Sequence, residues 1–177
     1  MRDKPLSKPI ELSTLQCQGW MSRLLSRANK VGLLGEVPIS AVVLDRKGHC
    51  IGHGSNCRER KKDPLGHAEI IALRQAALIK NDWRFNDCTL IVTLEPCPMC
   101  AGALIQARMG QVIFGATDLK RGGLGGVVNL SKDRSAHHKM IVKGGVMSDL
   151  ARHQLKEWFK FQRQSSLESE TTLFQKD

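Results

Sequence analysis

Apolar residues recur every three to four positions in four stretches of the chain, which is the spacing of helices that bury one face. These stretches are 12–31, 66–80, 97–108 and 148–164. In the first of them basic residues occupy the polar side, and Gly32 and Gly35 follow it as a stop signal. We therefore expect helices over these four ranges.

Short apolar runs rich in β-branched residues predict five strands between and after these helices. They lie at 38–44, 49–52, 88–94, 111–115 and 140–142. A polar turn separates the first two, which predicts a hairpin, and the continuously apolar third run predicts a central strand. Strands that alternate with helices indicate an α/β fold. We expect a three-layer α/β/α sandwich around a mixed five-stranded sheet, with the first two strands antiparallel and the later ones parallel.

The remaining segments are polar. At 177 residues the chain is long enough for one domain, which we place at 12–165. We expect 1–11 to be a flexible N-terminal extension and 166–177 a flexible C-terminal tail. Residues 55–65 read as a charged loop. The long, glycine-rich stretch 116–138 predicts a loop that is either functional or mobile.

Positive charge changes the expected class of partner. Lys and Arg number 27 against 17 acidic residues, so the formal net charge is +10 and the pI is near 9.6. The excess is concentrated between 120 and 163 and in the 55–65 loop. A generic basic surface is the alternative, but this concentration favours nucleic acid as the partner.

The spacing of the cysteines and the lengths of the apolar runs indicate the cellular compartment. Of six cysteines only Cys97 and Cys100 form a close pair. No stretch resembles a secretory signal, and no apolar run approaches the roughly 20 residues that a membrane span needs. We therefore expect reduced thiols, no membrane partner and a cytoplasmic protein.

Cys97 and Cys100 also carry the candidate chemistry. They follow the predicted strand 88–94 and stand three positions apart, which puts both thiols on one side of a helical turn. A helix N-terminus favours thiolates. His67 opens the helix at 66–80 in the same way, thirty residues upstream. One imidazole and two thiolates leave the fourth tetrahedral position of Zn²⁺ free for water, as in catalytic zinc sites.

Glu69 is the candidate catalytic residue of this site. It lies two positions after His67, roughly 200° around a regular helix, so it is not the obvious fourth ligand. It would instead reach toward the metal-bound water. A carboxylate in that place can shuttle protons, because the metal lowers the pKa of bound water to about 7.

Two other interpretations of the cysteine pair remain open. It could belong to a structural zinc site, with a fourth ligand from His53 or from the pair His137 and His138, or it could be a redox pair. A lone Cys-x-x-Cys is a weak signal. The combination of His-x-Glu at a helix start with Pro-Cys-x-x-Cys after a strand favours catalytic zinc.

These motifs resemble a known family. Val37-Pro38, Gly66–Ile70, Thr93–Ala103 and Phe114–Ala116 are similar to stretches of bacterial-type tRNA-specific adenosine deaminases, in the cytidine deaminase-like zinc deaminase superfamily. The resemblance extends from about 37 to 163. Cytosine, guanine and deoxycytidylate deaminases share the core signature, but the longer string around Cys97 favours the tRNA enzymes. The chain departs from the family pattern at 129–138.

The resemblance implies hydrolytic conversion of the wobble adenosine in a tRNA anticodon arm to inosine, by a cytoplasmic homodimer with one Zn²⁺ per subunit. It implies that His67, Cys97 and Cys100 hold the zinc and that Glu69 takes the proton of water and protonates the base. The same match implies further substrate contacts by Asn56, Ile39, Arg58, Asp118, Lys120, Phe159 and Arg163. Asn56 as a turn residue, and Ile39 as a core residue, are the alternatives.

Two competing functions remain at this point. One is a deaminase of a free base or nucleoside, of the guanine or cytosine type, which would have no need of the basic C-terminal third. The other is a binding subunit that keeps zinc only for structure. An intact Glu69 argues against the second, because binding subunits that have lost catalysis often lose the proton shuttle.

Overall fold

A five-stranded mixed sheet forms the centre of the computed structural model, which describes the backbone of residues 8–174 and the side chains of residues 8–165. Its strands are β1 (Ser40–Leu44), β2 (Cys50–Ser55), β3 (Thr89–Leu94), β4 (Gln111–Ala116) and β5 (Ile141–Lys143), in the spatial order β2-β1-β3-β4-β5. β1 pairs antiparallel with β2 and β3, whereas β3, β4 and β5 run parallel. The predicted hairpin and mixed sheet are confirmed.

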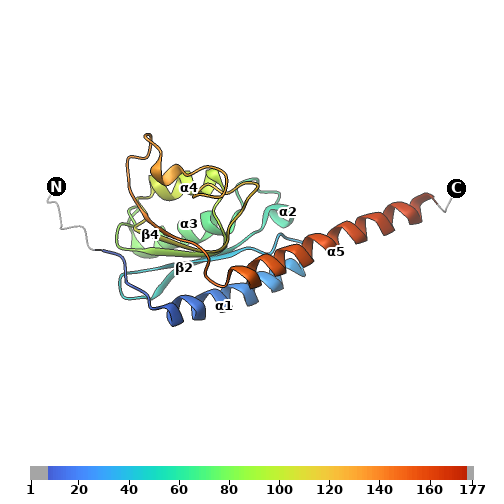
Figure 1. The fold of residues 1–177 in the computed structure, drawn as a ribbon, viewed down its shortest axis with the longest axis horizontal. Coiled ribbons are helices and arrows are strands. Elements are labelled where there is room, and N and C mark those ends of the chain that lie inside the picture. The colour runs from blue at the N-terminus through green and yellow to red at the C-terminus, as the bar shows by residue number, and fades with distance from the viewer. Residues whose placement is uncertain (1–7, 175–177) are drawn as a thin grey trace.

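Helices cover both faces of this sheet, which confirms the predicted three layers (Figure 1). They are α1 (Thr14–Gly32), α2 (Arg58–Lys61), α3 (Ala68–Lys80), α4 (Pro98–Gln106) and α5 (Ser148–Phe174), with a 3-10 turn at Leu130–Lys132. α1 and α5 pack on one face, and α3 and α4 on the other. None of the helices between residues 8 and 174 is both long and apolar enough to cross a membrane.

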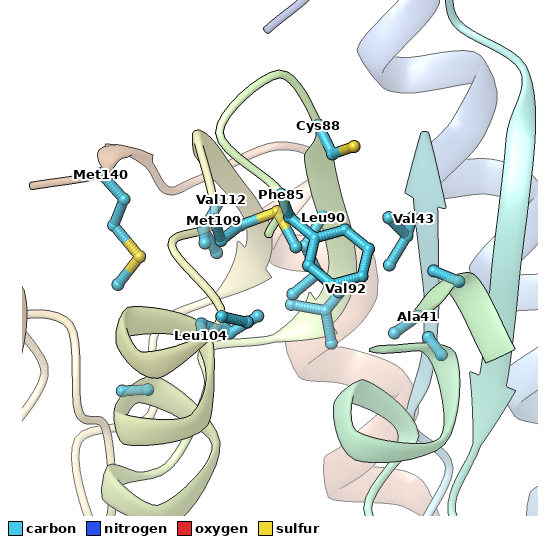
Figure 2. Packing of buried hydrophobic residues seen from close by; sticks show 14 of the residues in the cluster. Ala41, Val43, Phe85, Cys88, Leu90, Val92, Leu104, Met109, Val112 and Met140 are labelled. Carbon is cyan, nitrogen blue, oxygen red and sulfur yellow. The ribbon is translucent and has the colours of Figure 1, made fainter. Parts of the chain in front are cut away.

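Side chains along each strand point alternately to the two faces of the sheet, so the hydrophobic core has two parts. Val42 and Leu44 of β1 pack toward α1, while Ala41 and Val43 pack toward α3 and α4. In Figure 2 the ring of Phe85 lies within the second of these cores. Because both faces of each central strand are buried, those strands are continuously apolar, as the sequence indicated.

Two glycines of β2 let α3 lie close to the sheet. A Cβ on Gly54 would stand 2.2 Å from the carbonyl oxygen of Ala68, and one on Gly52 would stand 2.3 Å from that of Ala72. Both obstacles are helix backbone, which cannot move aside as a flexible side chain can. The close approach fixes the start of α3, and with it His67, against the sheet.

Gly54→Ala is therefore expected to lower the free energy of unfolding by about 1–3 kcal/mol, because the added methyl forces α3 away from β2. Gly19→Ala is the matched control. Gly19 is an exposed position within α1, where an added Cβ meets nothing within 4 Å. There the same change should stabilise the protein by about 0.5–1 kcal/mol. Urea unfolding of both zinc-loaded variants checks this, and equal effects would contradict it.

The structure departs from the sequence-based expectation in three places. α2 forms within the segment 55–65 that was expected to be a loop. α5 continues to Phe174, beyond the predicted end at 164, because no Gly or Pro interrupts the sequence there. Leu150 and Phe159 belong to the apolar repeat of the helix predicted at 148–164, one face of which was expected to be buried, but they are 56% and 45% exposed.

The two ends of the chain are only partly described. Residues 1–7 and 175–177 lie outside the described part, so the expected flexibility of 1–11 and of 166–177 stays a prediction. Over 166–174 the backbone continues α5, which projects past the body of the protein (Figure 1).

Candidate active site

The starts of two helices bring the predicted metal ligands together. His67 is the N-cap residue of α3, and Cys97 is the N-cap residue of α4, where Pro98 at the first helical position favours a helix start. Cys100 lies in the first turn of α4 and is fully buried. Unpaired N–H groups at both helix starts favour anionic ligands in the space between them.

The three donor atoms have the spacing of a zinc site. Nδ1 of His67 lies 3.7 Å from Sγ of Cys97 and 3.5 Å from Sγ of Cys100, and the three ligand atoms lie within 4.8 Å of one another. Ordinary Zn–N and Zn–S bond lengths with tetrahedral angles place N and S about 3.6 Å apart. The residues present therefore fit Zn²⁺.

The same cluster contains no fourth protein ligand. Among the described residues it is the one group of three or more His, Cys, Asp or Glu side chains spaced to hold a metal, and it includes none of the three histidines at 53, 137 and 138. A structural zinc site usually recruits four protein ligands. The geometry therefore favours an open, catalytic site over a structural one.

The two thiols differ in acidity. The hydrogen bond from Cys100 lowers the pKa of Cys97 to about 4, and the hydrogen bond with His67 acts in the same direction. The pKa of Cys100 is raised, first by its interaction with Cys97 and then by burial. The pair thus releases its first proton readily and its second reluctantly. A divalent cation would favour loss of both, because it binds thiolates.

Glu69 lies against these ligands as the second residue of α3. It is 4% exposed, and burial raises the pKa of its carboxyl group. The Cys100 thiol hydrogen-bonds to it, and the charges of Cys97 and His67 also act on it. A carboxylate whose pKa is raised accepts a proton more readily than a free one, and a proton acceptor beside the metal ligands is what general acid–base catalysis needs.

Asn56 joins the site through the start of α3. Its side chain is 4% exposed, and its Oδ1 accepts the N–H of Ala68 at 3.0 Å. That bond fixes the orientation of the amide, since only the oxygen can accept. Nδ2 then faces away, and within residues 8–165 it has no hydrogen-bond partner. The backbone N–H of Asn56 donates to the carbonyl of Ile39 at 3.1 Å, so these two predicted substrate residues are adjacent.

Comparison with known proteins shows which family the chain belongs to. A model of the MafB19-like deaminase family matches residues 15–153. The tRNA-specific adenosine deaminase of Haemophilus influenzae is 39% identical over 144 residues, which make up 81% of this chain and 83% of that protein. The chain belongs to the tRNA-specific adenosine deaminase family.

Solved structures agree with this family assignment. A structure from a study of A-to-I editing by tRNA:A34 deaminases at the wobble position of transfer RNA matches with a TM-score of 0.73 at 32% identity. The match covers 77% of this chain and 98% of the other. A guanine deaminase of Nitrosomonas europaea matches with a TM-score of 0.67 at 21% identity, covering 89% and 97% of the two chains. That second likeness shows a shared fold.

The residues that family resemblance suggested for RNA contact occupy separate segments. Arg58 begins α2 and lies near enough to His67 for its charge to act on that imidazole, whose pKa is raised chiefly by the hydrogen bond with Cys97. Asp118 and Lys120 form a turn after β4, in which Oδ1 of Asp118 accepts the N–H of Lys120 at 2.9 Å. Phe159 and Arg163 are exposed on one side of α5, four positions apart. Only Arg58 is linked to the metal ligands by a described interaction.

Two buried carboxylates near the deaminase site have roles that the sequence pattern did not indicate. Glu36, 1% exposed, accepts the N–H of Arg60 at 2.7 Å and so holds the start of α2. Glu95, 2% exposed, lies between β3 and Cys97 and accepts three backbone N–H groups. For Glu95 the sequence offers one signal, an acidic residue directly after an apolar strand. The backbone N–H groups that hydrogen-bond to Glu36 and Glu95 lie more than twenty residues away along the chain, and no sequence pattern indicates them.

Proposed function

We propose that this chain hydrolyses the C6 amino group of adenosine at the wobble position of a tRNA anticodon loop, giving inosine and ammonia. His67, Cys97 and Cys100 hold Zn²⁺, one ion per chain. The observation that carries the proposal is the placement of the buried carboxyl of Glu69 against an open three-ligand site. Membership in the tRNA-specific adenosine deaminase family supports the choice of substrate.

The proposed mechanism assigns both proton transfers to Glu69. When bound, zinc lowers the pKa of a water molecule to about 7 and so makes it a nucleophile at neutral pH. The carboxylate of Glu69 takes the proton of that water as its oxygen attacks C6, and delivers it to N1 of the adenine ring. Glu69 then carries the proton of the new C6 hydroxyl group to the exocyclic nitrogen, the C6–N bond breaks, and ammonia leaves as the C6 carbonyl of inosine forms. The raised pKa of Glu69 suits it to hold the proton between these steps.

Asn56 and Ile39 are proposed to form the base pocket. The free Nδ2 of Asn56 donates a hydrogen bond to a base acceptor, because its Oδ1 already accepts the N–H of Ala68. Ile39 is partly buried and packs at the margin of the core, which leaves part of its side chain to serve as an apolar wall. Core packing and substrate contact are thus compatible roles for Ile39.

The tRNA partner is proposed to lie across exposed cations and one aromatic ring. Arg58, Lys120 and Arg163 are exposed and have no acidic partner among the ion pairs of the described residues. Phosphates are the groups that such side chains bind, and an exposed ring such as Phe159 can stack on an unpaired base. Asp118 orders its own turn through Oδ1 and has its second oxygen left for a ribose or base.

A cytoplasmic homodimer is proposed on family resemblance and on exposed apolar surface. Leu119, Val127 and Val128 are 79%, 56% and 43% exposed on the loop after β4. These three side chains lie on one loop, and a second copy of the chain could cover exposed apolar surface of this kind. A second copy of the chain packed there would lie beside the turn that carries Lys120.

One comparative assay tests the function. The zinc-loaded chain is incubated with an anticodon stem-loop carrying adenosine at the wobble position, with the same stem-loop carrying guanosine there, and with free adenosine, guanine and cytosine. Inosine is expected in the first RNA, with no ammonia from the control RNA or from the free compounds. Ammonia from a free base, without inosine in the RNA, would contradict the proposal and identify a small-molecule deaminase.

A further inference from the structure

The glycine-rich loop after β4 is tied to one buried side chain. Oε1 of Glu95 accepts the N–H of Leu124 at 2.9 Å and of Gly126 at 2.8 Å, while Oε2 accepts the N–H of Asp118 at 3.0 Å. Both carboxylate oxygens therefore accept hydrogen bonds, and the backbone of the loop surrounds them. Within the stretch 116–138, whose length predicted a functional or mobile loop, this one side chain holds the backbone at residues 118, 124 and 126.

The glycines of this loop are required by that closure. A Cβ on Gly122 or on Gly126 would stand 2.5 Å from a carboxylate atom of Glu95. Gly123 donates its N–H to the carbonyl of Pro96 at 2.8 Å, and a Cβ there would lie 2.9 Å from the backbone of Cys97. The loop thus packs directly on the short segment that leads from β3 into the metal-binding helix α4.

The negative charge of Glu95 is offset by backbone dipoles. None of the ion pairs among the described residues involves it, and it is 2% exposed. A buried carboxylate without a cation needs hydrogen-bond donors, and bonds from N–H groups to a charged acceptor are stronger than neutral ones. The loop conformation and the orientation of the Glu95 carboxylate therefore depend on each other through these hydrogen bonds.

Glu95 also determines where the proposed RNA contacts lie. Its bond to the N–H of Asp118 fixes the first residue of the turn, and Oδ1 of Asp118 then accepts the N–H groups of Lys120 at 2.9 Å and Arg121 at 3.0 Å. The side chain of Glu95 begins two residues before Cys97. One carboxylate thus links the position of the Asp118–Lys120 turn to the position of a zinc ligand.

We propose that Glu95 is a positioning residue, which holds the RNA-contacting turn in register with the metal centre and takes no part in proton transfer. The RNA part of this statement rests on the proposed function. The attachment of the loop does not, because it follows from the hydrogen bonds and the glycine packing alone.

Glu95→Gln tests the role with little change in volume. The amide keeps one acceptor oxygen but places an NH₂ group against a backbone N–H, so one of the three anchors is lost. We expect KM for the anticodon stem-loop to rise about tenfold or more, as one unsatisfied buried donor predicts, with kcat changed less than about threefold and zinc content kept. The amides of residues 118, 124 and 126 should exchange hydrogen faster with solvent.

Asp87→Asn is the matched control, because it makes the same acid-to-amide change at the opposite end of β3. The Asp87 carboxylate pairs with Lys80 at 2.5 Å, away from the loop. This variant should lower Tm but leave KM and loop exchange as in the wild type. If it raises KM as much as Glu95→Gln does, the effect is general destabilisation and the proposal is overturned.

Two further outcomes are decisive. Unchanged amide exchange and unchanged KM in Glu95→Gln would overturn the proposal. Glu95→Asp keeps the charge but withdraws it by one methylene, so it should give intermediate KM and exchange, and it replaces the glutamine variant if that chain does not fold. A failure of the proposed function can be told apart from a failure of this anchoring role. A wild-type chain that forms no inosine contradicts the function, while faster exchange in Glu95→Gln still supports the anchoring.

Discussion

Glu69→Gln is expected to lower kcat for inosine formation by about 10²- to 10⁴-fold while zinc content stays as in the wild type. The loss is large because one carboxyl serves both proton transfers, from water to the ring and then to the leaving nitrogen. Glutamine has nearly the same shape, so a site that is only 4% exposed can accept it without repacking. The metal ligands do not include Glu69, which is why zinc should remain bound.

Zinc per chain by atomic absorption and single-turnover inosine formation on the stem-loop together measure this effect. RNA affinity of the variant should stay close to that of the wild type, since the defect lies in the chemical step. Glu157→Gln supplies the control, because it makes the same change at an exposed position of α5. If Glu69→Gln retains kcat within about threefold, Glu69 is not the proton shuttle and the assigned mechanism fails.

The grouping of His67, Cys97 and Cys100 could be predicted from sequence because its information is local. The spacing of Cys97 and Cys100 places both thiols on one helical turn, and Pro98 marks where that turn starts. The same holds for His67 at the start of α3. Joining the two halves required the topology, which the alternation of apolar runs also predicted, because both helices leave one sheet.

The supports of the site could not be predicted, because they depend on contacts between distant segments. The acceptor role of Asn56 requires the N–H of Ala68, twelve positions on, and Glu95 requires a loop that begins at Asp118. Hydrophobic periodicity reports which face of an element is buried, but carries no information on backbone hydrogen-bond partners. The same limit applies to Phe159, since a helical stripe cannot show that α5 extends past the core it packs on.

Cys100→Ala is expected to leave the protein with well below one zinc per chain and to lower kcat/KM by at least about 10³-fold, because two remaining ligands neither hold the ion firmly nor keep its geometry. Zinc binding should also stop contributing to stability. The Tm of the wild-type chain should rise with added zinc, by mass action on the folded state, and that rise should disappear in the variant.

Cys88→Ala separates the loss of a ligand from the loss of a buried sulfur atom. Cys88 is as fully buried as Cys100, lies just before β3, and stays protonated, since burial raises its pKa to about 12. Its removal should lower the free energy of unfolding by about 1–2 kcal/mol through the cavity, yet leave bound zinc and turnover unchanged. A Cys100→Ala chain that keeps a full equivalent of zinc, or a Cys88→Ala chain that loses it, would show that the cluster of His67, Cys97 and Cys100 is not the metal site.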